Sequence, residues 1–349
     1  MPLKKILLTG KQPNIAPPLD AATAQALILD GRGWSNNDRN SAYDALSPDQ
    51  LLECLGSWSP TVRERAAAAL QRRKGEKPLA AIVAMLQSPN LYARYGACEA
   101  LKAMRAQAAP AVKDLMALLD HDDLWLRIQA ADALAHIGKP AMDALPTLLQ
   151  RLTRGPTPAD PRNMEQRYLC FAVFGQMLKN SLEGVDRDLL FKAVAAGLQN
   201  QDGRARSDIA NIYKQLNFQE IKPLLPVVLR AVVEPAPSGI MFADGIRVSG
   251  LEVLAAHHVA EGMQACADYL RSQNKWASEK RTPQLLKILS TYGAHAKAVI
   301  PHLRETAAMF DRGEENFPGN LSKQKAQMVR EAITAIEASQ DRPELTRIR

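Results

Sequence analysis

The chain has 349 residues, too many for one ordinary compact core, so two domains or an elongated array of repeats are expected. Aromatic residues make up only 5% of it, whereas alanine and leucine are abundant, a composition typical of helical proteins. The net charge of +7, from 44 basic and 37 acidic residues, makes nucleic acid a candidate partner whose merit depends on where the charges lie.

Membrane insertion and export are not indicated by the sequence. No stretch of about 18 uninterrupted apolar residues is present, so we expect no membrane span. The apolar run at residues 6–8 is much shorter than the core of an export signal, which is about 7 to 15 residues long. We therefore expect a cytoplasmic protein if the chain is complete, and an exported one remains open if it is a fragment of a larger precursor.

The N-terminal residues 1–45 are predicted to form an irregular extension and cap. They hold one clear helical segment, residues 20–31. The end repeat of a repeat protein must cover an otherwise open core, which is the role we assign to this extension. The LTGK sequence at residues 8–11 is not a phosphate-binding loop, because the GxxxxGK[ST] spacing is absent.

From residue 63 onward an arginine recurs, followed by small residues and then by an apolar one. The first three versions read RERAAAAL, RYGACEAL and RIQAADAL, and bulkier versions follow. The arginines that open them are Arg63, Arg94, Arg127, Arg167, Arg206 and Arg247. A period of about 30 to 40 residues that holds two helices is typical of an α-solenoid.

Each repeat also has a predicted first helix before its arginine. These helices are predicted at residues 48–55, 77–86, 110–119, 144–152, 186–198 and 222–233. Several begin at or near proline, which suits a first turn because the N–H groups there have no partner within the helix. Ser59, Asn90 and Asp123 are candidate N-caps of the second helices.

The recurrence resembles the HEAT repeat family, most closely over residues 46–262. The resemblance implies an all-α, armadillo-like fold: a right-handed α-α superhelix of about six to eight helical pairs, with second helices lining the concave side. We predict HEAT-like repeats over residues 46–310 and a C-terminal loop and capping helix over residues 311–349. Beyond residue 262, Thr282 takes the position of the arginine.

Residues 43–70 also resemble the HEAT-bearing region of large uncharacterised bacterial multidomain proteins. This second resemblance implies no activity, and it suggests that the chain is a module of a larger protein.

The six arginines are expected to form a structural ladder. Small residues after each arginine let neighbouring second helices approach closely. The guanidinium groups should then bond acidic side chains or backbone carbonyls between successive repeats. The alternative, six ligand-binding arginines in a row, needs more coincidence.

The exposed stripe of the second helices is predicted at two, five and nine residues after each arginine. After the first repeat these positions are small, polar or mildly acidic, which suits a peptide or a basic protein segment better than nucleic acid. The candidate binding residues on this concave face are Glu99, Gln129, Asp132, His136, Gln176, Asp208, Asn211, Gln215 and Glu252.

Longer loops separate the first and second helices in the C-terminal half. They span residues 153–163, 234–246, 272–282 and 311–321. Loops of this kind emerge on one rim of a solenoid. The candidate anchors that they offer to a protein partner are Met241, Phe242, Trp276 and Phe317. The alternative is that these side chains fold back over the core.

Nucleic-acid binding is the competing hypothesis. Residues 61–77 hold most of the excess positive charge. A groove that binds the phosphate groups of nucleic acid should extend over successive repeats, whereas this positive charge is confined to one. DDLWLR at residues 122–127 is faintly similar to alkylpurine DNA glycosylases, HEAT-like enzymes with aromatic and acidic residues in the concave face. We expect Trp125 to pack in the core instead.

Catalytic, metal and cofactor sites are not predicted. His257 and His258 are adjacent and so point to different helix faces. Asp132 and His136 share a face, but no nucleophile is evident beside them. The cysteines form no CxxC pair and are expected in a reduced core: Cys54, Cys98, Cys170 and Cys266. We therefore predict a non-enzymatic scaffold that binds protein or peptide through the concave face and the C-terminal loop rim.

Overall fold

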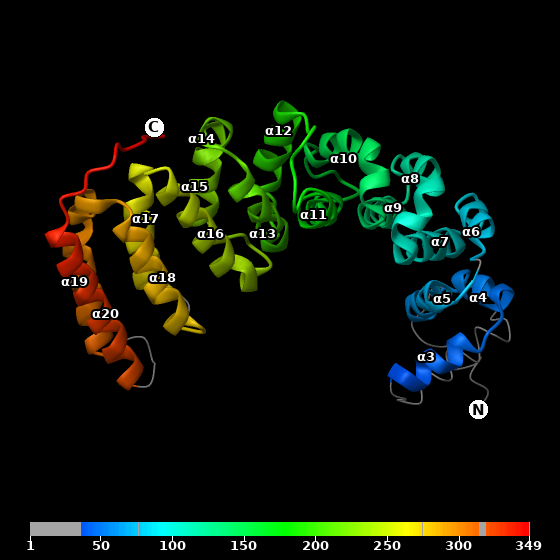
Figure 1. Ribbon diagram of the computed structural model, residues 1–349, viewed down its shortest axis with the longest axis horizontal. Helices are drawn as coiled ribbons and strands as arrows, with labels where there is room; N and C mark the ends of the chain where they lie inside the picture. Colours follow the sequence, from blue (N-terminus) through cyan, green and yellow to red (C-terminus); the bar gives the residue numbers. More distant parts are fainter. Residues whose placement is uncertain (1–35, 76, 274, 314–318, 349) are drawn as a thin grey trace. The chain divides into compact units, whose positions relative to one another are not determined.

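The computed structural model describes residues 36–75, 77–273, 275–313 and 319–348 (Figure 1). Helices dominate this part of the chain, and its extended pairings are isolated bridges such as Asp202 with Ser238 and Val259 with Thr346. The described residues form two compact units: those from 36 to 151 with 158–160 form unit 1, and those of 152–157 and from 161 to 348 form unit 2. The fold is all-α, as the sequence predicts.

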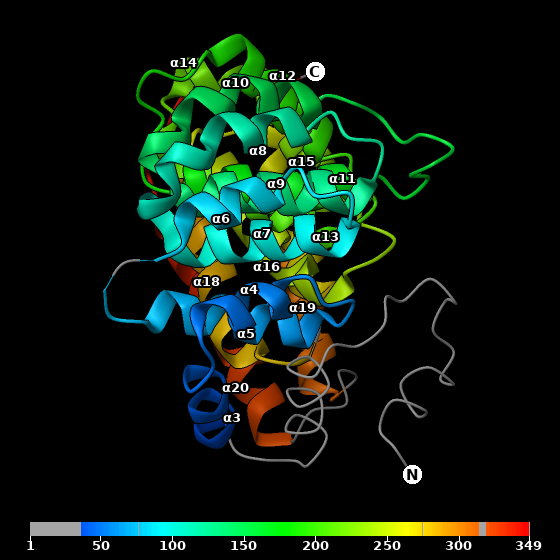
Figure 2. The same cartoon turned by 90° about the vertical axis from the view of Figure 1, so that its right-hand side faces the viewer.

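Unit 1 consists of helix pairs whose second helices lie side by side. After α3 (Asn36–Asp44), the first helices are α4 (Pro48–Leu55), α6 (Leu79–Met85), α8 (Val112–Leu118) and α10 (Leu145–Leu152). The second helices are α5 (Pro60–Arg72), α7 (Leu91–Met104) and α9 (Leu124–Ile137). Helix α5 packs on α7 and α7 on α9, while α4 lies against α5 (Figure 1, Figure 2).

Polar caps set the starts of these helices. Asn90 accepts a hydrogen bond from the N–H of Tyr92, and Asp123 accepts one from that of Leu126, as expected of N-caps. Ser59 occupies the N-cap of α5, but its side chain makes no capping hydrogen bond, so the prediction is only half right there. Pro60 at the first helical position leaves one fewer unsatisfied N–H group in this turn, because proline has none.

The core between the helices is made of alanine and leucine, as the repeat pattern predicts. Leu101 and Leu134 are fully buried, each one turn beyond buried alanines of its own helix. Gly96 allows the closest approach, because a Cβ atom there would lie 2.0 Å from the carbonyl oxygen of Leu55 in α4. All four cysteines are buried free thiols.

Unit 2 continues the alternation with less regular second helices. Its first helices are α12 (Arg187–Gly197), α14 (Phe218–Ile221) with α15 (Leu225–Val233), α17 (Ala260–Ser272) and α19 (Ile300–Asp311). Its second helices are α11 (Met164–Cys170), α13 (Gly203–Ile209), α16 (Ala243–Ala256), α18 (Ser278–Ser290) and α20 (Gly319–Ala338). Helix α11 continues as a π-helix to Met177, and α13 continues as a 3₁₀ helix to Gln215.

Both ends of the chain were predicted to form caps of the repeat array. Most of the predicted N-terminal extension and cap, residues 1–45, lies outside the described residues. At the other end, α20 occupies only part of residues 311–349. An extended tail of residues 339–348 follows it, which the expected capping helix does not include.

Candidate binding faces of the two units

The predicted ladder arginines sit one turn into their second helices and bond the chain around them. Arg63 donates from Nη1 to the carbonyl oxygen of Ser57 (2.9 Å) and from Nε to Glu99 in the next second helix (3.2 Å). The carbonyl six residues before the arginine accepts a hydrogen bond in three further repeats, those of Arg94, Arg127 and Arg206. These four arginines thus hold the turn that leads into their own helix; their contribution to stability stays a prediction.

Arg167 and Arg247 make contacts that differ from those of the other four predicted arginines. The Arg167 guanidinium lies 3.9 Å from the centre of the Tyr168 ring, with Nε 3.8 Å from the Asp202 carboxylate. Arg247 donates to the carbonyl oxygen of Val232 (3.2 Å) in the preceding first helix.

Arg281 is an additional ladder arginine that the sequence analysis missed. The assignment of this position to Thr282 is wrong: Thr282 is buried in the core, whereas Arg281 donates to the carbonyl oxygen of Trp276 (3.1 Å) and to Asp244 (2.9 Å). Helix α18 begins at Ser278, so Arg281 lies one turn into its helix, as the other arginines do. Counting from the helix start rather than from the small residues would have found it.

Unit 1 contains a hollow of about 550 Å³ on the side of its second helices. It brings together four predicted face residues, Glu99, Gln129, Asp132 and His136. The predicted positions two, five and nine after each arginine include only some of the other lining residues. These are Glu64, Ala67, Ala68, Gln71, Lys102, Ala103 and Arg105. Small alanine side chains form part of the lining, and charged side chains form much of the rest. We call this feature the unit 1 hollow.

Asp132 is the electrostatic centre of the unit 1 hollow. Lys102 Nζ lies 2.6 Å from its Oδ2, and His136 Nδ1 lies 3.1 Å from its Oδ1. Burial alone would raise the pKa of Asp132, but the hydrogen bonds from His136 and Lys102 outweigh it and hold the pKa below its usual value. The same contact raises the pKa of His136. The predicted pair of Asp132 and His136 therefore exists, as part of a three-residue ion-pair network.

Glu99 has the opposite behaviour. Its side chain is only 11% exposed, and this burial raises its pKa to about 7 despite the neighbouring Arg63. One carboxylate oxygen accepts the hydrogen bond from Arg63, and the other is buried without a partner in the described structure. The unit 1 hollow therefore contains a carboxyl group that changes charge near neutral pH.

Unit 2 has a larger hollow, of about 820 Å³, between the 3₁₀ end of α13 and helix α16. It contains two predicted face residues, Asn211 and Glu252. The remaining lining residues are Ser207, Ala210, Tyr213, Lys214, Leu216, Gly245, Ser249, Val253, Ala256 and His257. We call this feature the unit 2 hollow.

The other three predicted face residues lie outside both hollows. Gln215 uses its amide to cap the carbonyl oxygens of Leu178 (2.9 Å) and Lys179 (3.0 Å), so its donor is occupied. Burial raises the pKa of Asp208 to about 6, and Gln176 is exposed on the π-helix.

Fixed offsets from the arginine do not define the exposed stripe. The prediction that the residue two positions after the arginine faces solvent is wrong for Gly96, which lies against α4, and for Leu169, which is in the core. In the π-helical and 3₁₀ segments the residues per turn change, so the exposed face rotates relative to a regular α-helix.

The loop anchors are exposed rather than folded back. Met241 is 82% exposed and Trp276 is 73% exposed, so the alternative of lids over the core is wrong for both. Phe242 is half-buried, and Phe317 lies outside the described residues. Ile240, which the sequence analysis did not select, is 74% exposed.

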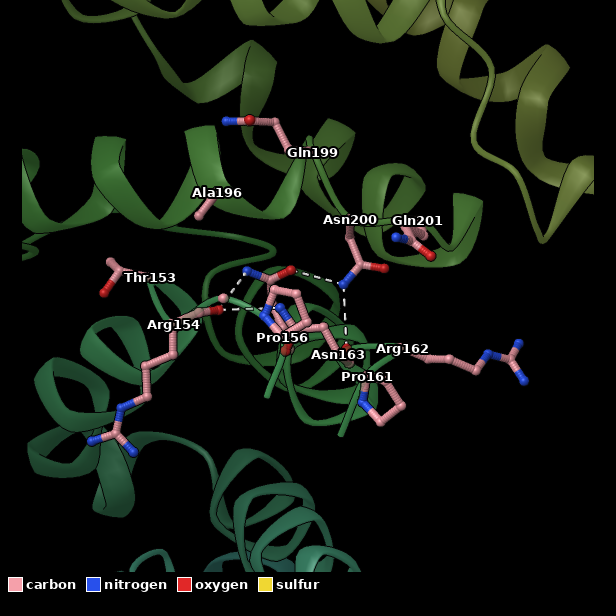
Figure 3. Close-up of a pocket in the computed structure, with 12 residues that line it drawn as sticks. Thr153, Arg154, Pro156, Pro161, Arg162, Asn163, Ala196, Gln199, Asn200 and Gln201 are labelled. Atoms are coloured by element: carbon pink, nitrogen blue, oxygen red, sulfur yellow. Dashed lines mark hydrogen bonds between the residues drawn. The ribbon is translucent and has the colours of Figure 1, made fainter. Parts of the chain in front are cut away.

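A third hollow, of about 340 Å³, lies in unit 2 beside the loop of residues 153–163 (Figure 3). Its floor is a chain of buried amides: Asn200 donates to Gln166 (2.7 Å), and Gln166 donates to the carbonyl oxygen of Leu152 (2.7 Å). Arg154 and Arg162 point away from each other, out of the hollow (Figure 3). These amides hold the long loop in place, which makes this hollow a structural feature.

Several cationic side chains of the basic first repeat are engaged in contacts within the protein. Arg72 forms a bidentate ion pair with Asp44 (2.7 Å), and Arg73 donates to the carbonyl oxygen of Leu46 (2.9 Å). Arg63 is paired with Glu99. Fewer cations are therefore available for phosphate groups than the sequence indicates.

Trp125, expected in the core, is 46% exposed, so that expectation is wrong. It is the second residue of α9, and its neighbour Leu126 takes the inward position. The described residues contain no cluster of His, Cys, Asp or Glu suited to a metal ion. Among them, too, no helix has the length and apolar character to cross a membrane.

Comparison with known proteins agrees with this architecture. Residues 48–116 match the family model of HEAT repeats. No curated protein matches the chain. A solved structure in which Kap95p binding induces the switch loops of RanGDP to adopt the GTP-bound conformation is similar, with a TM-score of 0.51 and 18% identity. The match covers 96% of this chain and 45% of that one, so this chain spans less than half of its neighbour.

The fold is that of a HEAT-repeat α-solenoid, and residues 48–116 carry the sequence signature of the repeat. Proteins of this architecture commonly use extended surfaces of stacked repeats to bind other proteins.

Proposed function

We propose that the protein is a non-enzymatic scaffold that binds a protein or peptide partner through the second-helix faces of its units and the exposed loops of unit 2. The observation that carries the proposal is the unit 1 hollow, which four of the predicted face residues line. The fold likeness to Kap95p, which binds RanGDP, supports the same class of function.

The lining of the unit 1 hollow suits a polypeptide segment. Ala67, Ala68 and Ala103 leave room for a partner side chain close to the helix backbones. The lining also contains charged groups of both signs, so it can pair with both the hydrogen-bond donors and the hydrogen-bond acceptors of a peptide. Small-molecule sites are mostly apolar with a few polar groups, which this lining is not. The partner that we propose for this hollow is therefore a peptide or a basic protein segment, as the sequence indicates.

Filling the hollow tests the proposal. Peptides would be selected from a displayed random library against the full chain, and their dissociation constants measured by fluorescence anisotropy. Ala103→Trp places a bulky side chain in the hollow, whereas Ala80→Trp places the same side chain on the exposed surface of first helix α6. Both variants must keep the thermal unfolding midpoint of the parent protein.

We expect the selected peptides to bind Ala103→Trp at least about ten-fold more weakly and Ala80→Trp unchanged, since about 1.4 kcal/mol of lost contact gives this factor. Equal affinity for both variants would show that the partner does not use this face.

A further inference from the structure

The tail that follows α20 lies extended against other parts of unit 2. It returns from the end of α20 toward the start of α17 (Figure 1). The N–H of Ala294 donates to the carbonyl oxygen of Asp341 (2.7 Å). Farther along, Thr346 pairs with Val259 in a parallel bridge, in which the N–H of Thr346 donates to His258 (3.0 Å) and its carbonyl accepts from Ala260 (2.9 Å).

The two turns that receive the tail, residues 257–260 and 293–295, form what we call the turn edge. Gly293 has φ +57°, and a Cβ atom there would lie 2.4 Å from the carbonyl oxygen of Asp341. Only glycine therefore allows the tail to come this close. His258 also has a positive φ, 45°, which is uncommon outside glycine, and its carbonyl accepts from the tail. His295 donates from Nε2 to the carbonyl oxygen of Pro343 (3.0 Å).

The tail is held mainly by its backbone. Its residues are exposed or half-buried, and none is in the core. The half-buried ones after residue 340 are Pro343, Leu345, Thr346 and Ile348. Recognition through main-chain hydrogen bonds with a few side-chain contacts is the way in which extended peptides add to an existing edge. Release of the tail would therefore break main-chain contacts without withdrawing a fully buried side chain of the tail.

We propose that the turn edge is a binding site for an extended segment of a partner protein, and that the C-terminal tail is its built-in competitor. The segment would follow the pattern of the tail: a proline, then apolar and β-branched side chains at the positions of Leu345, Thr346 and Ile348. This site lies apart from the unit 1 hollow, shares only His257 with the lining of the unit 2 hollow, and does not depend on the function proposed for them.

A tethered tail should compete strongly with such a segment. A short flexible tether gives an effective concentration of roughly 1 mM. If the free segment binds with a dissociation constant of about 100 μM, the tail weakens its apparent affinity about ten-fold. Releasing the tail should therefore expose the site.

The experiment uses the full chain and a fluorescent peptide with the sequence of residues 340–348, read out by anisotropy. Thr346→Pro removes the N–H that donates to His258 and should release the tail. Arg347→Pro is the matched control, because no hydrogen bond from the Arg347 N–H occurs among the described residues. On the receiving side, Gly293→Ala or His295→Ala is added to the Thr346→Pro protein.

We expect Thr346→Pro to bind the peptide at least about ten-fold more tightly than the parent and than Arg347→Pro. Adding Gly293→Ala should abolish this binding, and adding His295→Ala, which is milder for the fold, should weaken it several-fold. Thermal unfolding of each variant shows whether unit 2 is intact.

The proposal is overturned if releasing the tail does not tighten peptide binding, or if intact Gly293→Ala and His295→Ala proteins bind it as well. It is also overturned if light scattering shows a parent dimer that Thr346→Pro abolishes while the peptide does not bind, because a second copy would then be the occupant. Ala103→Trp should leave this binding unchanged, so failure here is distinguishable from failure of the unit 1 hollow.

Discussion

Glu99 should make the stability of unit 1 depend on pH. Burial raises its pKa from the ordinary 4.5 to about 7, and one pKa unit is worth about 1.4 kcal/mol. The resulting effect on the free energy of unfolding is at most roughly 3 kcal/mol. The nearby charges of Arg63 and Lys102 lower the pKa of Glu99, but burial is the larger influence.

The direction of this pH dependence follows from whether the folded or the unfolded chain loses the Glu99 proton first. Below pH 4.5 the carboxyl is protonated in the folded and the unfolded chain alike. Between pH 4.5 and 7 only the unfolded chain is ionised, so the free energy of unfolding falls by up to about 1.4 kcal/mol per pH unit. Above pH 7 both states are ionised and the decline ends. Glu99→Gln should remove this decline.

Tryptophan fluorescence during urea unfolding measures the effect in unit 1. Among the described residues, Trp58 and Trp125 lie in unit 1 and Trp276 in unit 2, so a background with Trp34→Phe and Trp276→Phe leaves reporters in unit 1 alone. Unfolding is compared at pH 5, 6, 7 and 8 with and without Glu99→Gln. If the two proteins lose stability in parallel across this range, pairing with Arg63 dominates over burial, and the reasoning is refuted.

Other predictions concern packing and charge. Leu134→Ala should lower the free energy of unfolding by about 2 to 5 kcal/mol in urea denaturation, because it leaves a cavity at a fully buried site. Gly96→Ala should cost about 1 to 3 kcal/mol or more, since its Cβ would overlap the Leu55 carbonyl; unchanged calorimetric stability would contradict the close approach of α7 and α4. Removing the whole ion pair, with Arg72→Ala and Asp44→Ala together, should barely change retention on a heparin column in a salt gradient, because the pair carries no net charge, and a large loss would favour nucleic acid.

The repeat pattern predicted the fold because its signal is local and periodic. An arginine one turn into each second helix, followed by alanines, reflects the same hydrogen bonds and the same close packing in each repeat. Arg63, Arg94 and Arg127 could therefore be aligned from sequence alone. Arg281 was missed because its helix lacks the small residues that fixed the alignment.

The candidate site was less predictable because it depends on how helices deviate from regularity. The end of α13 as a 3₁₀ helix beside Gly245 and Ser249 borders the unit 2 hollow, and no periodic rule anticipates it. The pairing of Asp132 with His136 could be predicted from spacing, but Lys102 comes from another helix. The tail was missed because its contacts are made by backbone groups, which leave little trace in the sequence.

Photo-crosslinking tests most directly the central claim that a partner binds the second-helix face of unit 1. A photoreactive amino acid would replace Gln71, which is exposed and lines the unit 1 hollow, or Gln87, which is exposed just beyond first helix α6. Our account predicts that a selected peptide is crosslinked from position 71 and not from position 87. Crosslinking from position 87 alone would contradict it.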